Sequence, residues 1–343
     1  MKAVLVEAPG SISYRALDPP VLRQSELLVR SHAAGLCRTD IEIRDGLVPQ
    51  YWIRYPIVPG HEWSGTVVEM GEGVEGFALG DRVVSEGMVP CNRCKRCRMG
   101  ETNICENYDQ IGFTRHGGYG ELVAVPQHTA HRLSDQVSLD AAVLVEPASC
   151  VYRALKRISP QPGDTIGIVG VGALGSLALL LARLFSPGIL VALGVREEEL
   201  EFAARLGASH TVNVARETPS AVHGIVPGGL DVVVETAGSP AAVRTALDGT
   251  RIGGKVALLG LAGSSSMLTV PSDEFVVKDL EVVGSLSYTT EMWTSVLNLL
   301  ETERLDFEPI VTHRFRIEDF MEAMDFMERR EGVVAKVLLC HPE

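Results

Sequence analysis

The sequence predicts an α/β protein in which a β-rich domain adjoins a domain built on a doubly wound parallel sheet. Before residue 150, short alternating strands are separated by Gly, Pro and Asp. Between about 150 and 285, apolar strands alternate with stretches of helical periodicity. The length of 343 residues exceeds the usual size of one core, so two domains are expected.

Particular segments carry this prediction. Alternating strands are expected at residues 26–30, 65–70, 81–85 and 119–125. Apolar parallel strands are expected at residues 166–170, 189–194, 231–236 and 255–260. An amphipathic helix from about Ile317 to Arg330 and a strand at 333–339 should pack back on the first domain. The predicted boundaries are therefore 1–149 and 150–286, with 287–343 completing the β-rich domain.

Charge and hydropathy exclude several kinds of partner. A formal net charge of -13 argues against nucleic-acid binding, which relies on a basic surface. The apolar segment Thr165–Phe185 is long enough to suggest a membrane span, but its glycines and Arg183 favour a buried strand and helix. The amino terminus lacks the apolar stretch of a signal peptide. We therefore expect a cytoplasmic protein with reduced thiols and no membrane partner.

Four of the seven cysteines are clustered in one loop. The run C-N-R-C-K-R-C-R-M-G-E-T-N-I-C places Cys91, Cys94, Cys97 and Cys105 at spacings of two, two and seven residues. Four thiolates at such spacings can surround a tetrahedral zinc ion and leave no position for substrate, so this zinc is predicted to be structural. A disulfide pair or an iron–sulfur cluster is the alternative.

A glycine motif indicates a dinucleotide site. Gly170, Gly172 and Gly175 form G-V-G-A-L-G directly after an apolar strand and at the start of a helix. These glycines allow a tight turn, close approach of the backbone to a pyrophosphate, and close packing of helix on strand. The helix amino terminus supplies amide donors and a positive dipole. The alternative is a tight turn without a ligand.

The second strand of this region ends without the acid that usually binds the adenine ribose. The expected position holds Gly194, and Arg196 follows two residues later. A guanidinium can bind a 2′-phosphate that a carboxylate would repel, so NADP is predicted in preference to NAD. The alternative is that Arg196 only begins a helix and neutralises Glu197–Glu199.

Two further metal-binding side chains lie far apart in the sequence. Cys37 lies in G-L-C-R-T-D and His61 in G-H-E-W-S-G. Together with the cysteine lobe and G-V-G-A-L-G, in this order, they make the chain similar to the zinc-dependent alcohol dehydrogenases of the medium-chain dehydrogenase/reductase family. The resemblance extends over essentially the whole length. It implies a GroES-like catalytic domain, a Rossmann domain, and a homodimer or homotetramer.

The resemblance also implies a second zinc ion, which is catalytic, on Cys37 and His61. Glu62 would lie close to this ion or bind it transiently. The polyol dehydrogenases of the family use a glutamate in an E-P motif as third ligand, and Glu146 precedes Pro147 here. Cys150 is a competing candidate, although a cysteine of this kind is usually a buried apolar group.

Two neighbours of Cys37 acquire roles from the same resemblance. Thr39 corresponds to the hydroxyl that passes the alcohol proton toward solvent. Asp40 corresponds to the carboxylate that orients the ligand histidine. A Thr-Asp pair also often caps a helix, so Asp40 has a purely structural alternative. Zinc in such a site lowers the pKa of a bound hydroxyl, so that hydride can pass to the nicotinamide.

The predicted substrate is a secondary alcohol or ketone, with a polyol, sugar or cyclitol favoured. Polar and aromatic residues expected near the zinc support this choice: Tyr51, Trp52, Arg54, Arg115 and His116. Surface exposure of the same side chains is the alternative.

Three other functions stay open. An aminocyclitol related to 2-deoxy-scyllo-inosamine is one possible substrate, because Y-P-I-V-P-G-H-E-W-S-G is similar to the aminocyclitol dehydrogenases. Threonine is another, although threonine dehydrogenases typically carry a histidine where this chain has Met88. A non-catalytic sensor of zinc or nucleotide would have no need of Cys37, Thr39, His61, Glu62 and Glu146 together.

Overall fold

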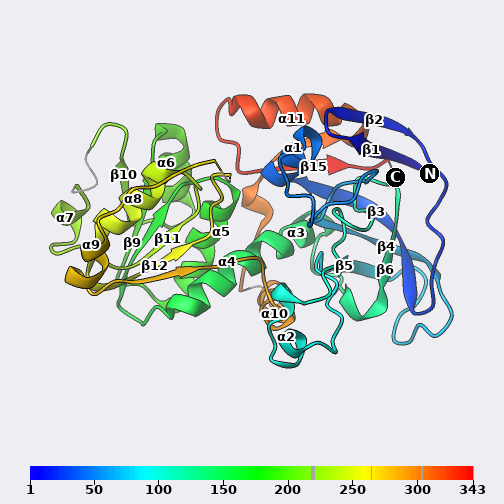
Figure 1. The fold of residues 1–343 in the computed structure, drawn as a ribbon, viewed down its shortest axis with the longest axis horizontal. Helices are drawn as coiled ribbons and strands as arrows, with labels where there is room; N and C mark the ends of the chain where they lie inside the picture. The colour runs from blue at the N-terminus through cyan, green and yellow to red at the C-terminus, as the bar shows by residue number, and fades with distance from the viewer. Residues whose placement is uncertain (218–220, 264, 303, 343) are drawn as a thin grey trace. The chain divides into compact units, whose positions relative to one another are not determined.

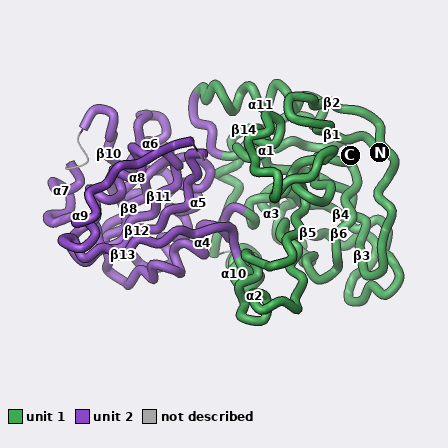
Figure 2. Tube along the Cα trace, in the orientation of Figure 1, with its two compact units in different colours: residues 1–146, 289–331, 336–343 green, residues 147–288, 332–335 purple. Residues whose placement is uncertain are grey.

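The computed structural model describes residues 1–217, 221–263, 265–302 and 304–342. The chain divides into two compact units, shown in green and purple in Figure 2. Unit 1 comprises Met1–Glu146, Thr289–Glu331 and Lys336–Glu343, and unit 2 comprises Pro147–Tyr288 and Gly332–Ala335. The domain boundaries given above stay a prediction.

The described residues of unit 1 form two sheets. In the smaller one, β1 (Lys2–Ala8) pairs antiparallel with β2 (Ser11–Ala16). The larger sheet has the order β14-β15-β3-β4-β5-β7, with β6 also paired to β3. Its strands are β3 (Glu26–Leu36), β4 (Trp63–Met70), β5 (Arg82–Ser85), β6 (Leu122–Pro126), β7 (Ala130–Arg132), β14 (Val311–Arg316) and β15 (Lys336–Cys340).

The C-terminal strand lies beside the strand that leads into the candidate site. β15 runs antiparallel to β3 and aligns Val337 with Leu36. Leu36 is the last residue of β3, and Cys37 follows it directly. The pairing therefore brings Lys336, the first residue of β15, to the same end of the sheet as Cys37. This confirms the predicted strand near the carboxyl end, and the helix before it is also present as α11 (Phe320–Arg329).

Short helices connect the strands of unit 1 (Figure 1). They are α1 (Arg38–Asp45), α2 (Lys95–Arg98), α3 (Leu139–Val143) and α10 (Thr290–Glu301), and α4 (Val145–Ile158) begins at the end of this unit. A buried apolar cluster joins α1 to β1 and includes Val6, Ile43, Ile57 and Phe113. Burial of these side chains fixes α1 against β1, and thereby fixes the backbone on which Cys37 lies.

Unit 2 is a doubly wound parallel sheet, as predicted. In the part of this unit that the structure describes, six strands have the order β10-β9-β8-β11-β12-β13, and neighbouring strands are parallel. They are β8 (Thr165–Val169), β9 (Ile189–Gly194), β10 (His210–Asn213), β11 (Leu230–Glu235), β12 (Thr250–Leu258) and β13 (Glu281–Gly284). The chain turns in opposite directions on the two sides of β8, and ligands of such folds bind where this reversal occurs.

Helices accompany this sheet (Figure 1), and buried side chains form an apolar core against it. They are α5 (Ala173–Ala182), α6 (Glu197–Arg205), α7 (Val222–Ile225), α8 (Pro240–Gly249) and α9 (Ser272–Val277), with α4 preceding them. The core is rich in β-branched residues such as Val191, Val233 and Val256, which are buried almost completely. The apolar segment 165–185 forms β8, α5 and a short 3-10 turn. In the described part of the chain, no helix is long and apolar enough to cross a membrane.

Candidate functional site

The fold brings three of the predicted site residues together in unit 1. Ligand atoms of Cys37, His61 and Glu62 all lie within 4.8 Å of one another. Cys37 is the N-cap of α1, and His61 and Glu62 immediately precede β4. β3 and β4 are antiparallel neighbours, so the end of one strand lies beside the start of the other. A thiol, an imidazole and a carboxylate at this separation are a donor set that zinc accepts.

Asp40 fixes the backbone around this cluster. One carboxylate oxygen accepts hydrogen bonds from the backbone amide of Cys37 at 2.9 Å and from the Tyr119 hydroxyl at 2.9 Å. The other accepts a long bond of 3.4 Å from the amide of Gly60. Asp40 therefore caps α1 and joins the two loops that carry Cys37 and His61. The capping role, which the sequence left as an alternative, is present in the structure.

His61 is oriented by the same carboxylate. Its Nδ1 lies 3.6 Å from Oδ1 of Asp40, which is too long for a hydrogen bond but close enough for a strong charge interaction. Burial lowers the pKa of His61, but the charges of Asp40 and Cys37 outweigh it and raise the pKa well above its usual value. The ring also contacts Phe113 edge to face, with centroids 5.3 Å apart. Because Nδ1 faces Asp40, Nε2 is the nitrogen available to a metal.

Glu62 is paired with a lysine. Oε2 of Glu62 lies 2.5 Å from Nζ of Lys336, and both side chains are almost completely buried. The Lys336 ammonium also donates to the carbonyl of Leu36 at 3.4 Å. Burial lowers the pKa of Lys336, but Glu62 and Cys37 reverse this effect and raise it. A Cβ at residue 35 would overlap the Glu62 carboxylate, so Gly35 leaves the space that this pair occupies.

Glu146 lies in the first turn of α4, outside the group of three. Its side chain is buried, and burial raises the pKa of its carboxyl group to about 7. The charges of His61 and Lys336 lower this pKa and that of Glu62 raises it, so Glu146 shares the electrostatic environment of the cluster. Within the described residues, no hydrogen bond to its carboxylate is present.

Thr39 lies close to the thiol of Cys37. The Cys37 thiol donates to Oγ1 of Thr39 across 3.6 Å, and both side chains are partly exposed. A hydroxyl that is close to a metal ligand and is also accessible can exchange protons with water. The geometry is therefore compatible with a proton-transfer role for Thr39.

The four-cysteine lobe is compact. The sulfur atoms of Cys91, Cys94, Cys97 and Cys105 lie within 4.8 Å of one another, and no disulfide is present among the described residues. The backbone amides of Cys91, Cys94 and Cys97 each donate to the sulfur of another cysteine at 3.4 Å. Such donors stabilise thiolates, and those of Arg93 and Cys94 lower the pKa of Cys91 to about 6. The lobe therefore fits a structural zinc.

The glycine motif of unit 2 has the expected geometry. Gly170 follows β8 with φ of 91°, a conformation that favours glycine, and Gly172 is the N-cap of α5. A Cβ at residue 175 would overlap the carbonyl of Gly170, so Gly175 permits the close packing of α5 on the turn. The turn therefore leads directly into the amino terminus of α5, the part of a helix that favours an anionic group.

Arg196 is engaged by its own helix. It is the N-cap of α6, and its guanidinium pairs with Glu198 at 3.3 Å and Glu199 at 3.7 Å. Gly194 ends β9, where a Cβ would lie 3.1 Å from Leu200. The alternative, in which Arg196 neutralises the acids of α6, is therefore present in the structure. A 2′-phosphate would have to compete with these carboxylates.

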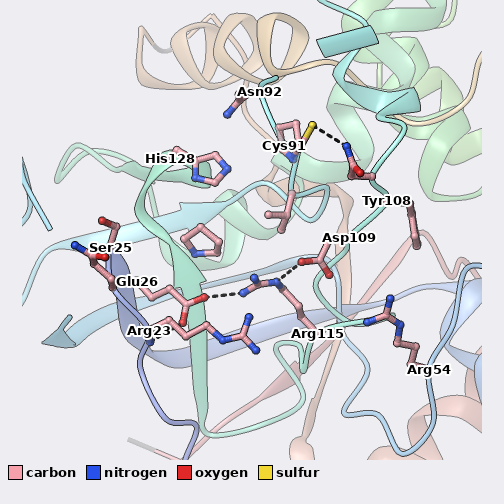
Figure 3. Close-up of a pocket in the computed structure, with 15 residues that line it drawn as sticks. Arg23, Ser25, Glu26, Arg54, Cys91, Asn92, Tyr108, Asp109, Arg115 and His128 are labelled. Atoms are coloured by element: carbon pink, nitrogen blue, oxygen red, sulfur yellow. Dashed lines mark hydrogen bonds and ion pairs between the residues drawn. The ribbon is translucent and has the colours of Figure 1, made fainter. Parts of the chain in front are cut away.

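Most of the side chains expected to face the substrate are instead paired with other residues or exposed to solvent. Arg115 pairs with Asp109 at 2.6 Å and Glu26 at 2.8 Å (Figure 3). Together with Arg54 it lines an open cavity of about 920 Å³ beside the cysteine lobe. The His116 ring accepts a hydrogen bond from the backbone of Val58. Tyr51 is 72% exposed, as the surface alternative predicts, and it contacts Trp52.

Sequence reasoning did not single out three residues of the site. Lys336, Tyr119 and Gly35 contact Glu62 or Asp40. Gly35 opens the motif G-L-C-R-T-D, but Lys336 and Tyr119 belong to no recognised motif. Of these two, Lys336 carries a signal in the sequence, because it is a single charge within the apolar strand V-V-A-K-V-L-L. A buried charge requires a partner, and this strand contains no acid.

Comparison with known proteins identifies the family. A family model described as Alcohol dehydrogenase GroES-like domain matches residues 23–135, and one described as Zinc-binding dehydrogenase matches residues 173–302. An L-threonine 3-dehydrogenase from Shewanella baltica is 34% identical over 328 residues, which cover 93% of each chain.

Two solved structures resemble the whole chain. A zinc-binding dehydrogenase from Sinorhizobium meliloti 1021 bound to NADP has a TM-score of 0.91 and 28% identity, with 99% of this chain and 98% of that chain covered. Galactitol-1-phosphate dehydrogenase from Escherichia coli has a TM-score of 0.90 and 27% identity, with 99% and 100% covered.

The chain belongs to the zinc-dependent medium-chain dehydrogenases, with a GroES-like domain and a Rossmann-like domain. It is therefore an NAD(P)-dependent dehydrogenase of the zinc-type alcohol dehydrogenase class.

The geometry of the cysteine lobe gives a prediction. Cys94→Ser should remove about one zinc ion per chain and lower the melting temperature by roughly 5 °C or more, because the lobe loses a ligand and unfolds locally. Metal analysis and a thermal melt measure both effects. Cys340→Ser, outside the lobe, is the control and should keep its zinc. Full metal content in the Cys94 variant would contradict a structural zinc here.

Proposed function

We propose that this dehydrogenase binds a catalytic zinc through Cys37, His61 and Glu146 and oxidises a secondary alcohol with NADP. The observation that carries the proposal is the group of Cys37, His61 and Glu62, in which His61 and Glu62 are buried and Cys37 is partly exposed. Asp40 and Glu146 add two more buried carboxylates to the same environment. Lys336 supplies one cation for these three buried carboxylates, and the remaining excess of negative charge is unfavourable unless a further cation neutralises it. The family supplies zinc as that cation.

Glu146 is proposed as the third ligand because its carboxylate is buried and lacks a hydrogen bond among the described residues. Its pKa of about 7 means that ionisation near neutral pH is opposed by burial, and a bound cation would remove that opposition. Glu62, in contrast, already has a cationic partner. When bound, zinc would supply Lewis-acid stabilisation of the substrate oxygen.

Two further residues are proposed to handle the alcohol proton and to orient the imidazole ring of His61. Thr39 is proposed to accept the proton of the alcohol and pass it toward solvent, which its partial exposure and its contact with Cys37 support. Asp40 is proposed to hold the His61 ring with Nε2 toward the metal. Hydride transfer itself belongs to the nicotinamide, which the turn Gly170–Gly175 would anchor by its pyrophosphate.

NADP is proposed as the preferred cofactor. Support comes from Gly194 in place of the usual acid, from the nearby guanidinium of Arg196, and from a relative of 28% identity that was solved with NADP. The pairing of Arg196 with Glu198 and Glu199 works against a phosphate, and NAD is therefore the alternative.

The proposed substrate is a secondary alcohol with a second polar group on the neighbouring carbon, and a polyol, sugar or cyclitol is favoured. The named activities of two relatives, on threonine and on galactitol 1-phosphate, share this chemistry. Threonine is the principal alternative, because relatives at 34% identity carry that name. Met88, buried where threonine dehydrogenases typically have a histidine, favours the polyol.

Assembly as a homodimer or homotetramer is also proposed. Large apolar side chains of unit 2 are strongly exposed, including Met267, Val276 and Val277. Contact between copies would remove these surfaces from water. A reducing compartment such as the cytoplasm would suit a lobe of four thiolates.

The ligand assignment predicts different effects for two residues of α4. Glu146→Ala should remove the catalytic zinc and abolish activity, whereas Cys150→Ala should keep both, because only Glu146 is assigned to the metal. Zinc per chain and turnover are the measurements. Loss of zinc in the Cys150 variant with retention in the Glu146 variant would reverse the assignment.

The cofactor assignment predicts a change in preference. Arg196→Ala should lower the ratio of NADP to NAD efficiency by roughly tenfold or more, because one charge-assisted contact with the phosphate is lost. Steady-state kcat/KM with each cofactor measures it. Arg205→Ala, at the other end of α6, is the matched control. An unchanged ratio in the Arg196 variant would contradict the proposal that Arg196 binds the 2′-phosphate of NADP.

The proposed activity can be tested directly. The zinc-loaded protein should reduce NADP, seen at 340 nm, with a polyol or cyclitol among a panel that also contains aminocyclitols, threonine and simple secondary alcohols. Faster reduction with threonine than with every polyol would select the alternative substrate. No reduction across the panel with both zinc sites filled would place the substrate outside these classes and contradict the proposed substrate.

A further inference from the structure

We propose that Lys336 is a positioning residue of the metal centre, whose ammonium group keeps the Glu62 carboxylate off the zinc so that a position stays open for substrate. The inference rests on the proposed function, since it presupposes zinc on Cys37 and His61. It goes further by assigning a residue of the C-terminal strand to the control of metal coordination.

The contacts of Lys336 leave it little freedom. Its side chain is 3% exposed, and Nζ lies 2.5 Å from Oε2 of Glu62, whose side chain is 2% exposed. The ammonium also donates to the carbonyl of Leu36, the residue before Cys37. Pairing of β15 with β3 fixes the backbone from which the lysine extends. The cation is therefore anchored beside the metal-binding group without being able to bind a metal itself.

Glu62 is within reach of the metal position. One of its carboxylate oxygens lies within 4.8 Å of the donor atoms of Cys37 and His61. Glu146 is a second carboxylate in the same buried environment. If both were bound, zinc would have four protein ligands and no open position. Something must therefore hold one of the two carboxylates back.

The structure distinguishes the two glutamates by their partners. Glu62 has a buried ion pair with Lys336, and Gly35 leaves the space in which its carboxylate lies. Glu146 has no hydrogen bond among the described residues. Breaking the ion pair would leave the ammonium buried without its charge partner, which is costly. Lys336 thus favours Glu146 as the ligand and retains Glu62.

Charge balance supports the same role. Thiolate Cys37 and the carboxylates of Asp40, Glu62 and Glu146 carry four negative charges, against two positive charges on zinc. The Lys336 cation reduces the excess. Without it, an unpaired buried Glu62 carboxylate would find its nearest cation in the metal. If Lys336 served only to join β15 to the sheet, its removal would not move the Glu62 carboxylate onto the metal.

The test compares the affinity of the protein and its variants for the catalytic zinc by chelator competition. Lys336→Met should bind this zinc at least about tenfold more tightly, because a positive charge is removed and Glu62 becomes a ligand. Its kcat should fall by about tenfold or more, because the open position is filled. With cobalt in place of zinc, Lys336→Met should have a visible spectrum different from that of the wild type. Lys336→Arg should keep the wild-type affinity and spectrum.

A second variant links the effect to Glu62. Glu62→Gln alone should change zinc affinity by less than about threefold, and Lys336→Met with Glu62→Gln should lose the tighter binding. Unchanged or weaker zinc binding in folded Lys336→Met would overturn the proposal. If that variant does not fold, a tenfold loss of zinc affinity in Glu62→Gln would overturn it, since Glu62 would then be a resting ligand. Absence of zinc from Cys37 in the wild type would instead refute the proposed function.

Discussion

The buried carboxylate of Asp40 is the interaction on which the candidate metal centre depends. It caps α1 through the Cys37 amide, receives the Tyr119 hydroxyl, and faces the imidazole of His61. These contacts join segments that are distant in sequence into one rigid frame. An apolar side chain in its place would leave a helix end, a tyrosine and a histidine without their partner at once. The metal-binding geometry is therefore inseparable from the folding of the loops that carry it.

The two predicted zinc sites use opposite strategies. The cysteine lobe draws all four donors from one loop, and its own backbone amides support the thiolates. The proposed second site would draw Cys37, His61 and Glu146 from three separated segments, and its neighbours are buried charges. A local site can form wherever its loop closes. A dispersed site exists only when the whole sheet is assembled, but its buried environment can tune a reaction.

Much of this architecture could be predicted from the sequence, because its signals are local. The apolar strand before Gly170 and the cysteine spacing each depend on a few consecutive residues. Short polar strands such as His210–Asn213 could not be predicted, since they lack an apolar pattern. The partners of Arg115 and the ion pair of Lys336 could not be predicted either. These contacts depend on which distant side chains the fold brings together, and the spacing of neighbouring residues does not predict them.

The pairing of β15 with β3 has a consequence for the order of synthesis. The last strand of the chain completes the sheet beside Cys37, although Cys37 itself emerges from the ribosome almost three hundred residues earlier. The thiol, the imidazole and the acids of this site therefore lack the cation of Lys336 until β15 has been synthesised and has paired with β3. A nascent or prematurely terminated chain would hold a reactive, negatively charged half-site. Premature capture of an incorrect metal ion is thus a hazard inherent in this topology.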